Sequence, residues 1–264
     1  MKLVFSESRA DYAGYTFPYV VWGFPEVGET PADCFSAGFL PSSPDLDRFY
    51  LCRQLRVPVQ DWAPSAENRR MLRKSASLEC RLVSREAFDY CGERRRQWLD
   101  FATERFGHGV MSGERLDRLM RSPVVSHLLV CVDRAGREVG HVLLYLEPPR
   151  VAYYYYAFYA LDPGAGMSGM QLMTRAVEVM AQAGMEFLHL GTCYEEKALY
   201  KLQFEPMQYF TGWRWSYDVD ALRSLVRFPL ASGHLLEQAG NPASVQVADA
   251  LMHSELALAP RRDA

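Results

Sequence analysis

The feature that most constrains the fold is an ordered run of strand and helix signals between His127 and Trp215. Apolar runs separated by turn residues predict three consecutive strands, and a glycine-rich loop and an amphipathic helix follow them. This order is typical of an α/β protein whose mixed sheet is flanked by helices. The predicted elements are strands over His127–Asp133, Glu138–Glu147 and Val151–Leu161, a helix over Met170–Ala183 ended by Gly184, a strand over Glu186–Gly191, a helix over Glu195–Leu202 and a strand over Met207–Trp215.

The glycine-rich loop contains Gly164, Gly166 and Gly169, and it opens the long helix of this run. Glycines let backbone N–H groups approach a phosphate, and a helix N-terminus favours negative charge. The order of strand, loop and helix resembles the GNAT acyltransferase fold. An acyl-CoA enzyme would use the loop for the pyrophosphate, although the loop carries no Arg or Lys. A flexible turn is the alternative interpretation.

The helix after the fifth strand carries the pair Tyr200-Lys201. The segment resembles the GNAT pattern in which a tyrosine acts as general acid toward the leaving group. A phenol, with an ordinary pKa of about 10, is a fair proton donor to a departing alkoxide or thiolate. We therefore take Tyr200 as the candidate acid and Lys201 as the candidate stabiliser of developing charge. The alternatives are a tyrosine ring packed on the sheet and a solvated lysine.

A polar and basic segment lies in the first half of the chain, after Pro64-Ser65, where Ser65 predicts a helix N-cap. Its residues are Asn68, Arg69, Arg70, Arg73 and Lys74. The segment resembles the motif of the arginyl-tRNA–protein transferases, the N-end rule aminoacyltransferases. Later landmarks fall in that family's order, so that the resemblance extends over roughly residues 38–215: Tyr153 to Tyr156, Asp162-Pro163, Leu190-Gly191 and Tyr200-Lys201.

This resemblance implies an aminoacyl-tRNA donor. Arg70, Arg73 and Lys74 can share one helix face, and such a face suits the phosphates of a tRNA acceptor end. An ordinary exposed basic face is the alternative. Tyr153 and Tyr155 would point to one side of their strand, where they would stack on the terminal adenine or line the acyl pocket.

Composition limits the remaining classes. The 264 residues carry a formal net charge of −3, which argues against a strongly basic nucleic-acid coat. No segment has the shape of a signal peptide or the length of a membrane helix, so we expect a cytoplasmic protein with no membrane partner. The six cysteines are scattered, which predicts neither a disulfide framework nor a metal site. Cys34 and Cys52 are expected to be structural.

Together these patterns predict an α/β (α+β) protein with a GNAT-like mixed sheet. Its parts would be a small N-terminal lobe over residues 1–80, an acyltransferase domain over residues 81–230 and a peripheral tail over residues 231–264. The predicted reaction moves an aminoacyl group, with arginyl as the candidate, from aminoacyl-tRNA to an acceptor amine such as a protein N-terminus, without a cofactor. Two alternatives stay open: an N-acyltransferase that uses acetyl-CoA or another acyl-CoA, and a catalytically silent relative that binds tRNA or protein. The oligomeric state is not predicted.

Overall fold

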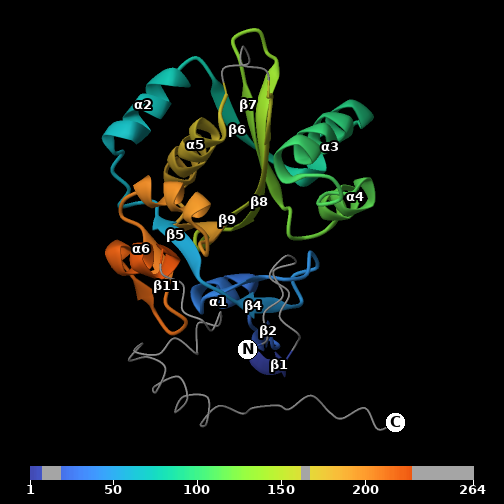
Figure 1. The fold of residues 1–264 in the computed structure, drawn as a ribbon. Helices are drawn as coiled ribbons and strands as arrows, with labels where there is room; N and C mark the ends of the chain where they lie inside the picture. Colours follow the sequence, from blue (N-terminus) through green and yellow to red (C-terminus); the bar gives the residue numbers. More distant parts are fainter. Residues whose placement is uncertain (8–18, 162–166, 228–264) are drawn as a thin grey trace. The chain divides into compact units, whose positions relative to one another are not determined.

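The chain forms two compact units in a computed structural model that describes residues 1–7, 19–161 and 167–227 (Figure 1). The first unit contains Met1–Leu55, Thr192–Leu202 and the described residues from Met207 on. The second contains Arg56–Gly191 and Gln203–Pro206. This division differs from the predicted boundary at residue 80, because the first unit is assembled from segments that are distant in the sequence. The predicted tail over residues 231–264 lies outside the described residues.

The first unit is built on a four-stranded sheet of order β1-β2-β4-β3. Each neighbouring pair is antiparallel. Phe35 and Phe49 are fully buried in this unit, and their rings meet edge to face with centroids 6.1 Å apart. The elements of the unit are β1 (Lys2–Glu7), β2 (Tyr19–Phe24), α1 (Pro31–Ser36), β3 (Phe39–Pro41), β4 (Phe49–Leu51), the 3₁₀ helix η3 (Glu196–Gln203, whose last residue falls in the second unit), β11 (Gln208–Phe210), β12 (Trp215–Ser216) and α6 (Val219–Arg227).

Two elements of this unit differ from the sequence prediction. Helix α1 was not predicted; a capping box between Thr30 and Asp33, together with Pro31 at the first turn, starts it. The last predicted strand is instead a hairpin of β11 and β12. Thr211 accepts a hydrogen bond from the Arg214 amide at its hydroxyl, and Gly212 adopts a φ of 101°, which a continuous strand does not allow.

The second unit contains six strands in the order β5-β10-β9-β8-β7-β6. From β6 to β9 the pairing is antiparallel, whereas β10 runs parallel to β9. The central strands read as near-continuous apolar runs because helices cover both faces of the sheet. The predicted class, a mixed sheet flanked by helices, is confirmed. The strands are β5 (Gln54–Pro58, whose first two residues fall in the first unit), β6 (Glu79–Ser84), β7 (His127–Val132), β8 (Glu138–Glu147), β9 (Val151–Tyr159) and β10 (Phe187–Thr192, whose last residue falls in the first unit).

Helices α2 and α5 lie on one side of this sheet, and α3 and α4 lie on the other (Figure 1). Helix α5 begins at the predicted place, because Ser168 caps it and Gln171 completes a capping box. It ends before Gly184, whose φ is 75°. The helices of this unit are α2 (Ala66–Lys74), the 3₁₀ helix η1 (Arg85–Ala87), α3 (Gly92–Phe106), α4 (Gly113–Arg121) and α5 (Gly169–Gln182).

Three of the six cysteines, Cys34, Cys52 and Cys193, are buried thiols, as expected, and Cys91 is a half-buried thiol. The other two differ from the expectation. Cys80 and Cys131 face each other in the register of β6 and β7 and form a disulfide. Cys34 and Cys52 are both fully buried, and burial raises the pKa of the Cys34 thiol to about 12. Among the described residues no helix is long and apolar enough to cross a membrane.

Candidate functional site

The parallel strands β9 and β10 separate within the second unit. They pair only at their first residues, from Phe187 opposite Val151 to His189 opposite Tyr153. Both strands continue beyond this point, to Tyr159 and Thr192. Beyond Tyr153, therefore, no described strand pairs with the edge of β9 that faces β10.

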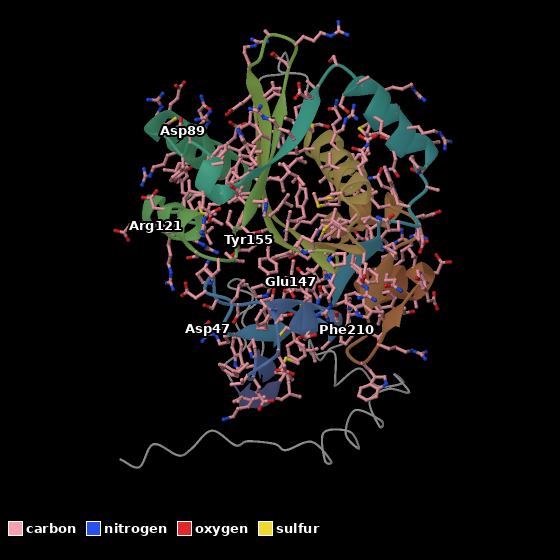
Figure 2. All side chains as sticks on the ribbon, turned by 180° about the vertical axis from the view of Figure 1, so that it is seen from behind. Asp47, Asp89, Arg121, Glu147, Tyr155 and Phe210 are labelled. Carbon is pink, nitrogen blue, oxygen red and sulfur yellow. A yellow bond between two sulfur atoms is a disulfide. The ribbon has the colours of Figure 1, made fainter. Side chains whose placement is uncertain are left out.

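A β-bulge lies on β9 just after this separation begins. The register to β8 places Tyr156 opposite Leu143 and Tyr154 opposite Leu144, so Tyr155 is the extra residue. Figure 2 shows Tyr155 on the sheet of the second unit. A bulged residue lies outside the hydrogen-bonding ladder, and neither neighbouring strand offers Tyr155 a register partner. Its backbone N–H is the kind of donor that can polarise a carbonyl oxygen.

The bulge also changes the arrangement of the tyrosine side chains. Tyr153 and Tyr155 are neighbours as expected, with ring centroids 5.3 Å apart. The rings of Tyr155 and Tyr156 are also neighbours, with centroids 4.7 Å apart. In a regular strand these two side chains would point to opposite faces of the sheet. Burial raises the pKa of the Tyr155 phenol to about 12, and the Tyr156 hydroxyl accepts a hydrogen bond from Arg115 at 3.2 Å. The Tyr155 ring therefore remains neutral, and it forms one aromatic wall with the rings of Tyr153 and Tyr156.

Of the predicted loop glycines, only Gly169 falls in the described part of the chain; Gly164 and Gly166 lie outside it. Gly169 is the first residue of α5. A Cβ atom at this position would lie 3.1 Å from the Tyr159 hydroxyl oxygen. A side chain at this position would therefore crowd the Tyr159 ring, so the glycine favours the close approach of α5 to β9, which is a packing role independent of any phosphate.

The basic segment forms α2 as predicted, but its side chains are not equivalent. Asn68 is fully buried and shares a capping box with Ser65, so its side chain cannot contact an aminoacyl-tRNA at the surface. Arg69 donates to the Pro64 carbonyl at 2.7 Å. Arg70 pairs with Glu67, with Nε and Oε2 2.6 Å apart. Three of the five residues of this segment that were predicted to contact the tRNA are thus engaged by neighbouring residues of the same segment.

Arg73 and Lys74 are exposed at the end of α2, and no described carboxylate pairs with either. Arg175 on α5 holds this helix end, because its guanidinium donates to the Ser75 carbonyl at 2.6 Å and to the Ser75 hydroxyl at 2.9 Å. Two available cations therefore lie together on an anchored helix terminus.

The predicted catalytic pair lies on η3, a 3₁₀ segment where an α-helix was expected, and belongs to the first unit. Tyr200 is 47% exposed. Lys201 is half-buried and donates to the Thr192 carbonyl at 3.1 Å. Burial lowers the pKa of the Lys201 ammonium, although the neighbouring Cys193 thiol opposes this effect. The tyrosines of β9 belong to the other unit.

A second buried cation in the first unit was not predicted. Arg53 is only 5% exposed, and its guanidinium lies over the Tyr194 ring at 5.3 Å from the centroid. Burial lowers the pKa of Arg53, and Nε has no hydrogen-bond partner among the described residues. No described carboxylate forms an ion pair with Arg53. Burial raises the pKa of the Cys193 thiol, and the charges of Lys201 and Arg53 both oppose this effect. A buried guanidinium such as that of Arg53 suits an anion.

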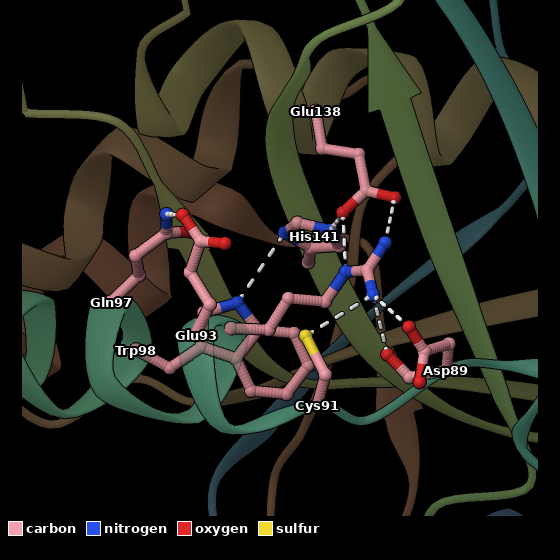
Figure 3. Close-up of polar contacts among 8 residues, drawn as sticks. Asp89, Cys91, Glu93, Gln97, Trp98, Glu138 and His141 are labelled. Atoms are coloured by element: carbon pink, nitrogen blue, oxygen red, sulfur yellow. Dashed lines mark hydrogen bonds and ion pairs between the residues drawn. The ribbon is translucent and has the colours of Figure 1, made fainter.

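On the α3 side of the second unit, an ion-pair cluster fixes the helix to the sheet (Figure 3). Arg94 on α3 binds Glu138 on β8 through two contacts of 2.7 Å. His141 lies 2.9 Å from the same carboxylate through Nε2. The Trp98 indole N–H lies 3.4 Å from Nδ1 of His141. Since an indole nitrogen only donates, the proton of the neutral His141 ring is on Nε2, directed at Glu138.

Comparison with known proteins adds a relationship in sequence, although no family model matches the chain. It is 25% identical over 197 residues to an aspartate/glutamate leucyltransferase of Ruegeria pomeroyi, covering 72% of the chain and 71% of that relative. It is also 22% identical over 174 residues to an aspartate/glutamate leucyltransferase of Rhizorhabdus wittichii, covering 62% of the chain and 65% of that relative. The proteins that it resembles over most of its length are thus aminoacyl transferases.

Solved structures give a weaker likeness. FemX superposes with a TM-score of 0.43 at 9% identity, covering 57% of each chain. The L-PGS structure from Bacillus licheniformis gives a TM-score of 0.40 at 12% identity, covering 54% of this chain and 46% of that one. The fold class stated above depends on the strand order and register of the chain itself.

Proposed function

We propose that the protein transfers an aminoacyl group from aminoacyl-tRNA to the α-amine of an acceptor polypeptide. The similarity to two leucyltransferases over most of the chain carries this proposal. Both relatives are named as leucyltransferases, so leucyl is the aminoacyl group that their names give. The arginyl group expected from the basic motif stays a prediction, and so do the acyl-CoA donor and the silent binding role.

The acceptor that we propose has an acidic first residue. The relatives are named for aspartate and glutamate, and the buried Arg53 guanidinium offers a positive charge to one carboxylate, with the half-buried Lys201 as the second candidate. A guanidinium removed from water and left without a carboxylate is unfavourable. A bound acceptor side chain would supply the missing anion through charge-assisted hydrogen bonds.

The chemistry needs little from a general base. An α-amine has an ordinary pKa of about 7.7 to 8.0, so roughly a tenth of it or slightly more is neutral at pH 7. The amine nitrogen attacks the ester carbonyl, the new C–N bond forms, and the acyl C–O bond to the terminal ribose breaks. The departing ribose oxygen gains a proton, and the amine nitrogen releases one, so the acid is restored. The Tyr200 hydroxyl is our candidate to protonate the departing oxygen.

The donor would be held chiefly by charge. Arg73 and Lys74 on α2 are the exposed cations available for phosphates, and such contacts provide affinity without reading sequence. Tyr153 and Tyr155 form the aromatic wall beside the edge of β9 that faces β10, which suits the terminal adenine or the acyl group.

The acceptor assignment is tested with Arg53→Gln. Peptides that begin with Asp and with Asn are compared as acceptors, so only the acceptor charge differs. Loss of a charged hydrogen bond worth about 1.5 to 3 kcal/mol predicts a fall in kcat/KM of roughly 10- to 100-fold for the Asp peptide, with little change for the Asn peptide.

The matched control is Arg48→Gln. The Arg48 guanidinium also stacks on an aromatic ring, 4.9 Å from the Trp22 centroid, but its side chain is exposed. An equal loss for both peptides in a folded Arg53→Gln protein would remove Arg53 from acceptor recognition. If that variant does not fold, Lys201→Met makes the same comparison.

A further inference from the structure

A cavity of about 330 Å³ lies on the α3 side of the sheet in the second unit, at the low end of the range for small-molecule sites. We call it the α3 cavity. Neither the aminoacyl transfer nor the basic helix uses it. Helix α3, the start of β8 and the end of β9 form its walls. Its lining includes Trp98, Phe101, Phe158 and Tyr159 together with Asp100, Glu104 and Glu138.

The floor of the α3 cavity is aromatic and rigid. Trp98 and Phe158 are buried, and their rings stack with centroids 4.7 Å apart and an angle of 5° between the ring planes. The rings of Phe101 and Tyr159 meet edge to face, with centroids 4.7 Å apart. Such a floor binds apolar groups and also attracts cations through the ring faces.

The charge of the lining has one sign. It contains carboxylates and no lysine or arginine. Glu138 is already paired with Arg94, and the deep His141 ring is neutral because it accepts from Trp98. Asp100 and Glu104 are different: both are exposed at the rim, one helical turn apart, and no described cation pairs with either. Like charges at this spacing repel each other, and a bound cation would relieve that repulsion.

One contact in the structure already shows a cation beside this wall. The Arg105 guanidinium lies over the Tyr159 ring, 5.7 Å from the centroid. No group of metal-ligating side chains occurs among the described residues, and aromatic walls do not suit a hydrated metal ion. Both observations favour an organic cation over an inorganic one.

We propose that the α3 cavity binds an organic ammonium ion with a short apolar body. The ammonium lies between Asp100 and Glu104, and the apolar body lies on the aromatic floor. Two sources provide this chemistry. One is the free α-ammonium group of an aminoacyl ester, a source that depends on the proposed function; the other is a free alkylamine or polyamine.

The test follows the indole N–H signal of Trp98 in the ¹⁵N-labelled full chain, identified by its loss in Trp98→Phe. Leucinamide represents the aminoacyl source and cadaverine represents the polyamine source. Isocaproamide has the skeleton of leucinamide without the ammonium group. We expect at least one amine to move the Trp98 signal saturably at millimolar concentration, and isocaproamide to leave it unchanged.

Variants then place the ammonium. Asp100→Asn combined with Glu104→Gln should raise the Kd of the binding amine by about 3- to 10-fold, because both exposed carboxylates lose their charge. Glu114→Gln on α4, exposed and outside the lining, is the control and should leave the Kd unchanged. Since the altered side chains at the rim are exposed, the double variant is expected to fold.

The outcomes separate this proposal from the proposed function. Binding of leucinamide or cadaverine without any aminoacyl transfer would keep the cavity assignment and reject the transferase. Binding of cadaverine alone would assign the cavity to polyamines. Failure of both amines to move the Trp98 signal, equal binding of isocaproamide, or an unchanged Kd in the double variant would overturn the proposal.

Discussion

Replacing Glu138 by Gln should destabilise the second unit by removing the carboxylate that joins β8 to α3. Hydrogen bonds from Arg94, and less strongly from His141, lower the pKa of the Glu138 carboxyl from its ordinary value of 4.5 to about 2. At about 1.4 kcal/mol for each tenfold change in acidity, this corresponds to roughly 3 kcal/mol at neutral pH. Because Arg94 keeps a second partner, Asp89, we expect a loss of about 2 to 3 kcal/mol in Glu138→Gln.

The pH dependence has a defined sign. A lowered carboxyl pKa gives stability that is fully present above pH 4.5 and disappears as the pH falls toward 2. Urea unfolding should therefore show a large difference between the native protein and Glu138→Gln at pH 7, and this difference should shrink as the solution is acidified below pH 4.5. Glu114→Gln, which lacks such a partner, should match the native protein. A loss below about 0.5 kcal/mol at pH 7, typical of a surface substitution, would refute the reasoning.

Two further predictions concern the transfer reaction. Tyr200→Phe should fold normally, with a stability change of about 1 kcal/mol or less, and should lower kcat by at least about tenfold if the hydroxyl is the acid; an unchanged kcat would exclude it. Arg73→Gln combined with Lys74→Gln should weaken tRNA binding and reduce the slope of log affinity against log salt by about 2. Arg70→Gln is the control, because Glu67 already holds that guanidinium, and an effect as large as that of the double variant would contradict the assignment.

The elements that could be predicted from the sequence are those with local signals. Helix α5 has a cap at Ser168 and a terminating glycine at Gly184, and the β7–β8 hairpin has its turn residues between two apolar runs. The basic helix α2 was predicted from Ser65 and the spacing of its cations. In each case the deciding interactions lie within a few residues of one another.

What the sequence did not predict depends on contacts between distant segments. The bulge at Tyr155 exists only in the register of β9 against β8. The burial of Arg53 depends on Tyr194, which lies far along the chain, and the only local signal was an arginine among apolar neighbours. The disulfide needs β6 opposite β7, a pairing of segments about fifty residues apart that no local pattern around Cys80 or Cys131 indicates.

The most direct measurement of the central proposal is transfer of a radiolabelled aminoacyl group to an acceptor peptide. Leucyl-tRNA and arginyl-tRNA are supplied in turn with a peptide that begins with Asp, and labelled acetyl-CoA is supplied in a parallel reaction. The account predicts that label moves from an aminoacyl-tRNA to the peptide α-amine, with leucyl favoured by the named relatives. Label transferred only from acetyl-CoA, or from no donor, would contradict it.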